Sequence, residues 1–175
     1  MRAATKRSSR SLLAAGLLLC LCFAAGRRIC FAAEPLVDQQ APEFARAALM
    51  GGHVDLASFR GKVVLLNFWA SWCAPCLVEM PVFVKWQREF GPRGLQVVGV
   101  SMDDDPALAR RIAIQLKLNY PVAIGDEKLG ELYGGVLGLP LSYLIDKKGR
   151  VRARFQGETD PKTIEKKWKE LLAER

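Results

Sequence analysis

The sequence predicts an α/β fold in one domain, with a central mixed β-sheet and helices on both faces. Two near-continuous apolar runs, at 63–69 and 95–100, are typical of strands that are covered on both sides. A helical stretch separates them, and strand, helix and strand within about 40 residues form a parallel unit with a right-handed crossover. Later, the turn at 147–150 joins two apolar runs into an antiparallel hairpin. The length of 175 residues and the apolar content of 50% fit one domain with a sizeable core.

Residues 1–33 have the three-part pattern of a secretory signal: a basic start, an apolar run at 12–25 and an Ala-rich patch. At about 1.5 Å per residue this run reaches roughly 21 Å, short of the ~30 Å hydrocarbon core. We therefore expect a cleaved signal peptide, or an N-terminal membrane anchor if the segment stays, with the domain in the periplasm or another extracytoplasmic space. The alternative is an organellar transit peptide, because the segment is rich in Arg and Ser. Residues 34–40 are expected to be a linker, and residues 41–175 the folded domain.

The basic charge is concentrated in this leader. It holds six of the 26 Lys and Arg residues and no Asp or Glu, so the rest of the chain carries 20 basic and 18 acidic residues. Because the domain is nearly balanced in charge, the net charge of +8 does not indicate nucleic-acid binding. The cysteines divide in the same way, with Cys20, Cys22 and Cys30 in the leader and Cys73 and Cys76 in the domain.

The first elements of the domain are a strand, a second strand, a helix and a third strand. Val54 and Leu56 alternate with polar residues after a Gly-Gly turn, as in an edge strand. The strand at 63–69 leads to a helix that ends near Phe90. The apolar residues expected on the core face of this helix are Val78, Val82, Trp86 and Phe90.

Two Asp-Pro pairs start the later helices, because Asp caps a helix and Pro suits its first turn. After Asp105-Pro106, the residues expected on the core face are Leu108, Ile112 and Leu116. After Asp160-Pro161, they are Ile164, Trp168, Leu171 and Leu172.

Shorter elements are expected between these helices. They are a strand at 121–124, a helical turn at 129–133, and the hairpin strands at 142–146 and 151–156. Alternating strands and helices followed by a hairpin give a mixed sheet with helices on both faces.

Cys73 and Cys76 form the one local constellation in this sequence that can carry chemistry. They are three residues apart, after a buried strand and at a helix start, which has a redox interpretation. Free N–H groups and the positive end of the helix dipole favour a thiolate there, so Cys73 is expected to be the attacking nucleophile. Cys76 lies one turn further in, more buried, and is expected to resolve the mixed disulfide. Pro75 suits the first helical turn, where its missing N–H needs no partner.

Two structural interpretations compete with the redox one. A tetrahedral zinc site needs four ligands, and beyond this pair the domain offers only His53 and carboxylates, so we expect no metal. A purely structural disulfide would close a very small loop and constrain the unfolded chain little. His53 is expected to be an exposed loop residue. The acidic run at 103–105 is expected to form a loop and helix cap, because three consecutive side chains do not converge on a cation.

A resemblance to thioredoxin is carried by the stretch Asn67-Phe68-Trp69-Ala70-Ser71-Trp72-Cys73-Ala74-Pro75-Cys76, with Pro81 beyond it. Four flanking pieces are similar to the exported, TlpA-like branch of thiol-disulfide oxidoreductases. They are Ala41-Pro42-Glu43-Phe44, Phe59-Arg60-Gly61-Lys62, Gly138-Leu139-Pro140 and Ile145-Asp146-x-x-Gly149. The resemblance covers residues 41–172, and its most specific part is the Trp-Cys motif. It implies a thioredoxin fold and dithiol–disulfide exchange at the cysteine pair.

The same resemblance implies a surface that docks substrate. Leu139-Pro140 would be a cis bond beside the cysteines, and an X–Pro bond is the plausible place for cis geometry. The implied docking residues are Trp72, Ala74, Pro75, Leu139 and Pro140. Trp69 is expected in the core instead. Leu141-Ser142 departs from the family, which often has small hydroxyl residues after the proline, and this bears on the substrate preference of the rim.

Asn67 stands where cytoplasmic thioredoxins, which resemble this stretch, carry a buried aspartate. Asparagine cannot act as a carboxylate base. Glu79 lies three residues after Cys76 on the same helix face, and the exported branch often has a glutamate there. A desolvated carboxyl has a raised pKa and can accept or return the Cys76 proton, which makes Glu79 the candidate proton acceptor. The alternative is a solvated glutamate.

The function implied is that of an exported thiol-disulfide oxidoreductase without a cofactor. Members of this branch usually reduce cysteine-containing client proteins, often in cytochrome c maturation, and need a membrane thiol electron donor. An oxidase would use the same residues. We expect a monomer. The other classes considered are a redoxin-type thiol peroxidase, which usually has Thr before the reactive Cys, and a non-catalytic thiol or copper-handling module, for which only Met80 lies near the pair.

Overall fold

The computed structural model describes residues 36–174, so the predictions for the leader lie outside the described residues. Its centre is a five-stranded sheet in the order β5-β4-β3-β6-β7. The strands are β3 (Val63–Trp69), β4 (Leu95–Ser101), β5 (Val122–Ile124), β6 (Leu141–Ile145) and β7 (Val151–Gln156). β3, β4 and β5 run parallel, whereas β6 is antiparallel to both β3 and β7. The predicted mixed sheet and its hairpin are confirmed.

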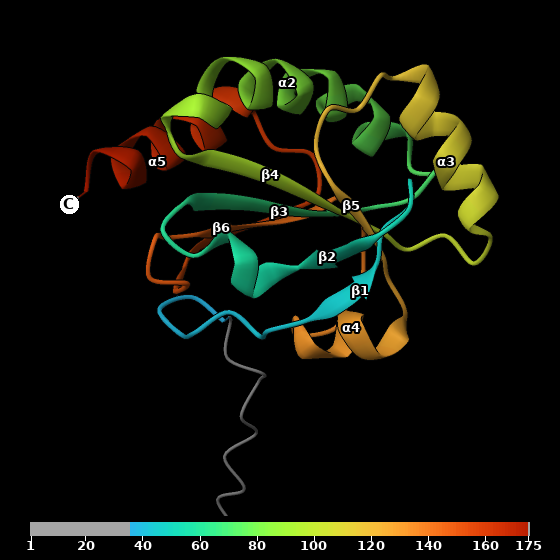
Figure 1. Ribbon diagram of the computed structural model, residues 1–175, viewed down its shortest axis with the longest axis horizontal. Coiled ribbons are helices and arrows are strands. Elements are labelled where there is room, and N and C mark those ends of the chain that lie inside the picture. The colour runs from blue at the N-terminus through green and yellow to red at the C-terminus, as the bar shows by residue number, and fades with distance from the viewer. Residues whose placement is uncertain (1–35, 175) are drawn as a thin grey trace, which may run out of the picture. The chain divides into compact units, whose positions relative to one another are not determined.

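Helices cover both faces of this sheet (Figure 1). On one face lie α2 (Ala74–Phe90), α3 (Pro106–Gln115) and α5 (Pro161–Ala173), which share one buried cluster. On the other face lie α4 (Glu127–Leu132) and a small sheet of β1 (Ala45–Ala47) and β2 (His53–Asp55). None of the helices in this part of the chain combines the length and the apolar character that crossing a membrane requires.

Every residue of β3, the middle strand, is buried. Leu65 and Trp69 belong to the cluster under α2, whereas Leu66 and Phe68 belong to the cluster on the opposite face. Because strand side chains alternate between faces, a strand covered on both sides needs apolar residues at nearly every position. Asn67 is the exception. It lies two residues from Leu65 and so shares the α2 face, two residues before the strand ends at Trp69.

The core face predicted for α2 is wrong at its first member. Val78 is 75% exposed, and the buried positions of the first turns are Cys76, Glu79 and Met80. A spacing of four residues advances by about 40° with each turn, so residues chosen at that spacing drift away from a single face. The helix continues through Pro81 and is followed by a 3₁₀ turn at Gly91–Arg93.

Two further expectations need correction. On α3, Leu108 is 43% exposed, and the buried residues are Ala109 and Ala113, whose small side chains let the helix lie close to the sheet. Val54 lies in the separate two-stranded sheet, and Leu56 begins a 3₁₀ helix, Leu56–Phe59, rather than extending a strand. The faces of helices and the ends of short strands are set by neighbours that local spacing does not reveal.

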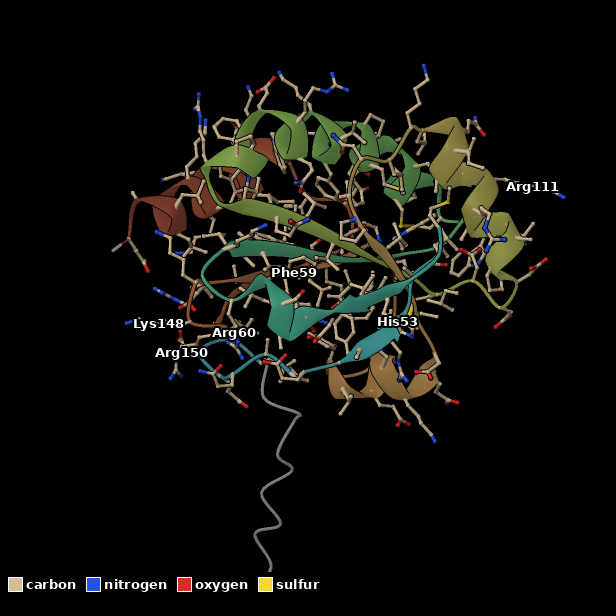
Figure 2. The ribbon with its side chains drawn as sticks, in the orientation of Figure 1. His53, Phe59, Arg60, Arg111, Lys148 and Arg150 are labelled. Carbon is tan, nitrogen blue, oxygen red and sulfur yellow. A yellow bond between two sulfur atoms is a disulfide. The ribbon has the colours of Figure 1, made fainter. Side chains whose placement is uncertain are left out.

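Three of the flanking motif pieces meet at the start of β3, whereas the cysteines follow its other end. Arg60 donates a hydrogen bond to the Lys148 carbonyl (2.5 Å; Figure 2) and forms an ion pair with Glu43. The Ala41 N–H donates to the Gly149 carbonyl at 2.9 Å. Gly149 has a φ of 80°, and a Cβ there would lie 1.0 Å from Arg60 Nη1. These contacts hold the three segments together, so the motif pieces have a structural role.

The start of β7 is also held by the segment before the domain core. The Asp38 N–H donates to the Val151 carbonyl (2.7 Å), and the Val151 N–H donates to the Gln39 carbonyl (2.8 Å). Residues at the end of the 34–40 segment thus add hydrogen bonds along the edge of the main sheet.

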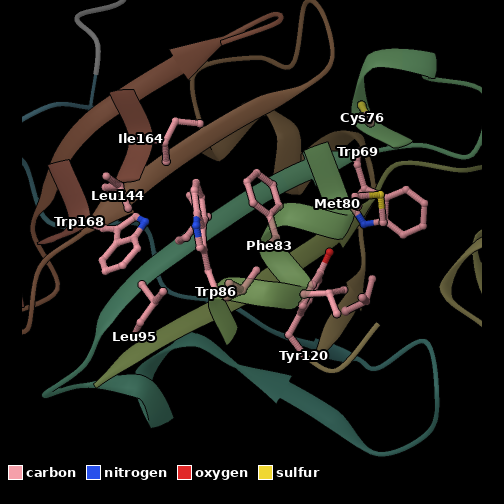
Figure 3. Close-up of a cluster of buried hydrophobic side chains, with 14 of the residues drawn as sticks. Trp69, Cys76, Met80, Phe83, Trp86, Leu95, Tyr120, Leu144, Ile164 and Trp168 are labelled. Atoms are coloured by element: carbon pink, nitrogen blue, oxygen red, sulfur yellow. The ribbon is translucent and has the colours of Figure 1, made fainter. Parts of the chain in front are cut away.

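Trp168→Ala should lower the free energy of unfolding by about 3–5 kcal/mol. The Trp168 side chain is 0% exposed, and its ring centroid lies 5.7 Å from Trp86 (Figure 3) and 4.7 Å from Phe90. Truncation leaves a cavity between α5 and α2. Urea denaturation measures the change, and Met50→Ala, at a side chain that is 65% exposed, should cost less than about 0.5 kcal/mol. A similarly small cost for Trp168→Ala would mean that α5 adds little to the core.

Candidate active site

Cys73 is the residue that caps the N-terminus of α2. β3 ends at Trp69, and the chain turns so that the Cys73 N–H donates to the Ala70 carbonyl at 3.1 Å. The Cys73 Sγ then accepts a hydrogen bond from the Cys76 N–H at 3.3 Å, as a capping oxygen does in other helices. Pro75 lies in the first turn. The predicted position of the pair at a helix start is confirmed.

A disulfide joins Cys73 and Cys76, whose Cα atoms are 5.3 Å apart. Both residues are buried, but Cys73 keeps 4% of its surface exposed and Cys76 none. The rim beside them is open, since Trp72 is 71% exposed, Ala74 is exposed and Pro75 is half-buried. An incoming sulfur atom therefore meets the Cys73 side of the pair first.

The Leu139–Pro140 bond is cis, as the resemblance implied. Leu139 packs against both buried clusters, one of which contains the two cysteines. The departure from the family at Leu141-Ser142 lies in the core and not on the exposed surface. Leu141 is 0% and Ser142 2% exposed, because both belong to β6 and face the two layers of the core.

Glu79 is buried, with 8% of its surface exposed. One carboxyl oxygen accepts a hydrogen bond from Asn67 Nδ2 at 2.8 Å, and the same amide donates to Ser142 Oγ at 3.0 Å. Burial raises the pKa of Glu79 to about 7, although the hydrogen bond from Asn67 acts to lower it. The alternative of a solvated glutamate is wrong, and this carboxyl exchanges its proton near neutral pH.

Tyr120, just before β5, is a neighbour of this carboxyl that no sequence pattern indicated. It is buried in the cluster that also holds Cys76 and Met80 (Figure 3). Burial raises the pKa of Tyr120, and the negative charge of Glu79 raises it further. Tyr120 therefore stays neutral, and of these two groups Glu79 is the one that titrates near neutral pH.

The remaining sequence candidates are His53 and the acidic run at 103–105. His53 is exposed, as expected, but it belongs to β2 rather than to a loop (Figure 2). Asp105 caps α3, where its Oδ1 accepts the Ala107 N–H at 2.9 Å, whereas Asp103 turns instead toward Ser71. Across residues 36–174, no group of three or more His, Cys, Asp and Glu side chains could hold a metal ion.

A groove of about 680 Å³ adjoins the site. Its walls include 102–104, which follow β4, and 135–137, which precede the cis bond. Its acidic lining residues are Asp103, Asp104, Asp126, Glu127 and Glu131, and its large apolar ones are Met102, Ile124, Val136 and Leu137. No lysine or arginine lines the groove among the residues that the structure describes. The groove is therefore negatively charged with an apolar lining.

Comparison with known proteins gives four consistent findings. The profile of the AhpC/TSA family matches residues 37–154. The thiol-disulfide oxidoreductase ResA of Bacillus thuringiensis subsp. konkukian is 33% identical over 172 residues, which are 94% of this chain and 98% of that protein. A Chlorobium tepidum structure assigned as a thiol:disulfide interchange protein DsbE has a TM-score of 0.71 at 34% identity, covering 77% of this chain and 96% of that one. A secreted thiol-disulfide isomerase of Corynebacterium glutamicum has a TM-score of 0.69 at 29% identity, covering 78% and 86%.

These similarities agree with the geometry of the site. The matched region contains the mixed sheet as far as the middle of β7, the Cys73–Cys76 disulfide at the start of α2 and the cis bond before β6. The relatives named above are described as proteins that exchange thiols and disulfides, which is the chemistry that a cysteine pair at a helix N-terminus supports. The chain belongs to the AhpC/TSA family, and it is a thiol-disulfide oxidoreductase with a thioredoxin fold.

Proposed function

We propose that this oxidoreductase is exported and reduces disulfides of cysteine-containing client proteins, as in cytochrome c maturation. The observation that carries the proposal is the hydrogen bond from the Cys76 N–H to Cys73 Sγ (3.3 Å) at the start of α2. In the reduced protein, the same N–H group and the helix dipole stabilise a thiolate. This thiolate and the greater exposure of Cys73 make Cys73 the nucleophile and leave Cys76 as the resolving thiol.

Exchange takes two steps and moves two electrons from the pair to the client. The Cys73 thiolate attacks one sulfur of the client disulfide, forms a mixed disulfide and releases the first client thiolate. Cys76 gives its proton to the Glu79 carboxylate and attacks Cys73 Sγ, which breaks the mixed disulfide and releases the second client thiolate. The two client thiolates take up protons. The products are a reduced client and the Cys73–Cys76 disulfide.

The surface beside the pair suits a polypeptide client. Trp72 and Leu137 are 71% and 92% exposed, and they stand next to Cys73 and shortly before the cis bond. Large exposed apolar side chains beside a reactive centre favour docking of a chain over entry of a small molecule. The acidic groove adds a charge preference, because it complements client segments that carry basic and apolar residues.

Two observations support export. The leader at 1–33 has the pattern of a secretory signal, and one of the similar structures is named as a secreted isomerase. An exported pair meets no cytosolic reductant, so we propose that a membrane thiol electron donor returns it to the dithiol. The direction of exchange follows from the reduction potential, about −270 mV for a reductant such as thioredoxin and about −120 mV for a strong oxidant.

The chain shortened to begin at Glu34 should be a monomer that reduces insulin disulfides, because the cysteine pair and its partners lie after that residue. Its reduction potential should be about −270 mV or lower. The assays are insulin reduction with dithiothreitol as electron source, redox titration, and consumption of hydrogen peroxide by the same protein.

Each alternative has its own signature in these assays. Peroxide consumption faster than insulin reduction would favour a thiol peroxidase, and failure to reduce insulin would favour a non-catalytic thiol or copper-handling module. A reduction potential of about −120 mV would indicate an oxidant. Activity that is present in the full chain but lost with residues 1–33 would show that the leader cysteines take part.

A further inference from the structure

Asp103 is a buried carboxylate that lies directly behind the loop carrying Cys73. Its two oxygens accept the Ser71 N–H, each at 3.0 Å, and one of them accepts the Ser71 hydroxyl at 2.5 Å. The other oxygen accepts the Ser101 hydroxyl at 3.0 Å. Asp103 is only 5% exposed. Three of its four hydrogen bonds thus come from a residue two positions before the nucleophile.

The same loop is fastened at its two ends by backbone hydrogen bonds. The Trp69 carbonyl accepts the Met102 N–H at 2.8 Å, and the Ala70 carbonyl accepts the Cys73 N–H at 3.1 Å. Ser71 lies between these points and is held through Asp103. The end of β4 therefore fixes the path of the chain from β3 into α2, and with it the position of Cys73.

The charge of Asp103 is not balanced by an ion pair. In the described part of the chain, no Lys, Arg or His lies within ion-pair distance of its carboxylate. The titratable groups on the elements packed around the site are Glu79 on α2, which contacts Asn67, Tyr120 before β5, which neighbours Glu79, and Asp103 after β4, which contacts Ser71. A buried negative charge close to Cys73 disfavours its thiolate and opposes the effect of the helix terminus.

We propose that Asp103 is a positioning residue that holds the Cys73 loop through Ser71 and, through its charge, keeps the cysteine pair reducing. The inference rests on the proposed role of Cys73 as the nucleophile. An oxidising pair is one whose reduced form is stabilised as a thiolate. An anion behind the nucleophile acts in the opposite direction, because it raises the free energy of the thiolate and so favours transfer of electrons to the client.

The test compares Asp103→Asn with Asp104→Asn in the chain that begins at Glu34. Both variants remove one negative charge, but Asp104 is exposed and belongs only to the groove. Asp103→Asn should lower the pH midpoint of Cys73 alkylation by about one unit. It should also shift the equilibrium with glutathione by about threefold or more toward the dithiol. Asp104→Asn should change neither by more than about a third of these amounts.

Ser71→Ala separates the effect of the Asp103 charge from the effect of an ordered Cys73 loop. If Asp103→Asn does not fold, the result with Ser71→Ala decides the test. It removes the hydroxyl donor but keeps the carboxylate, so the alkylation midpoint should stay or rise, while exchange slows several-fold because the loop is less ordered. A fall in the midpoint for Ser71→Ala, or equal midpoints for Asp103→Asn and Asp104→Asn, would overturn the proposal. Insulin reduction by the unaltered protein tests the proposed function separately, since alkylation and glutathione equilibration need no client.

Discussion

Cys73→Ser abolishes disulfide exchange, whereas Cys76→Ser leaves the first step intact and traps it. We expect the first variant to slow insulin reduction on the order of a thousandfold or more, because a serine hydroxyl does not attack sulfur at neutral pH. The second keeps the thiolate at the start of α2 but lacks the group that breaks the mixed disulfide. Mass spectrometry after incubation with a disulfide-containing client should detect the covalent adduct with Cys76→Ser and none with Cys73→Ser.

The same assignment can be checked without a variant. In the reduced protein, iodoacetamide at pH 7 should label Cys73 before Cys76, because Cys73 keeps 4% exposure and caps the helix while Cys76 is fully buried. The variant lacking both cysteines is the control for labelling elsewhere. Faster labelling of Cys76 would exchange the two roles.

The central strands were predictable because their environment constrains every residue. A strand covered on both faces needs apolar side chains at nearly every position, and 63–69 shows this plainly. The orientation of the helices was less predictable. Val78 was expected in the core and is 75% exposed, while α3 buries two alanines in place of Leu108. Spacing shows which residues share a helix face, but the contact with the sheet also depends on neighbouring side chains from distant parts of the chain.

The site residues also differ in how far they could be predicted. Those within one short motif were predictable from the sequence, whereas their partners from distant parts of the chain were not. Cys73, Cys76 and the helix start belong to one short motif, and the spacing from Cys76 also indicated Glu79. The partners of these residues come from elsewhere, because Asn67 lies 12 positions from Glu79 and 75 from Ser142. Asp103 lies 32 positions from Ser71. Such contacts leave no periodic pattern, so the hydrogen bonds that hold the carboxyl and the loop became visible only in the folded chain.

Glu79→Gln should slow the resolving step about tenfold or more above pH 7 and increase the fraction of trapped mixed disulfide. Because burial raises the pKa of Glu79 to about 7, the carboxylate that can take the Cys76 proton forms as the pH rises through neutrality. Glutamine fills the same space and can still accept the hydrogen bond from Asn67, but it takes up no proton. Exchange rates measured from about pH 5 to 9 should rise near pH 7 for the native protein and lack that rise in the variant.

The matched control is Glu89→Gln, which removes an exposed carboxylate from the same helix. It should leave the pH profile unchanged. Cys73 alkylation should change much less than the resolving step in Glu79→Gln, since activation of Cys73 comes mainly from the helix terminus. Superimposable profiles for Glu79→Gln and the native protein would leave bulk water as the proton acceptor.

The stability of Glu79→Gln provides an independent check. The substitution should raise the free energy of unfolding at high pH although it slows exchange. The pKa of Glu79 is raised from 4.5 to about 7, so the folded protein binds this proton more tightly than the unfolded chain does. The contribution is present below about pH 4.5 and is lost as the pH rises through 7, on the order of 3 kcal/mol in total. The oxidised Glu79→Gln protein lacks this loss and should therefore be more stable than the native protein at pH 8, with the difference closing at low pH. If Glu79 served only to stabilise the fold, its replacement by Gln would lower the free energy of unfolding. A variant that is more stable at pH 8 and yet slower in exchange would show that the buried carboxyl is retained for proton transfer.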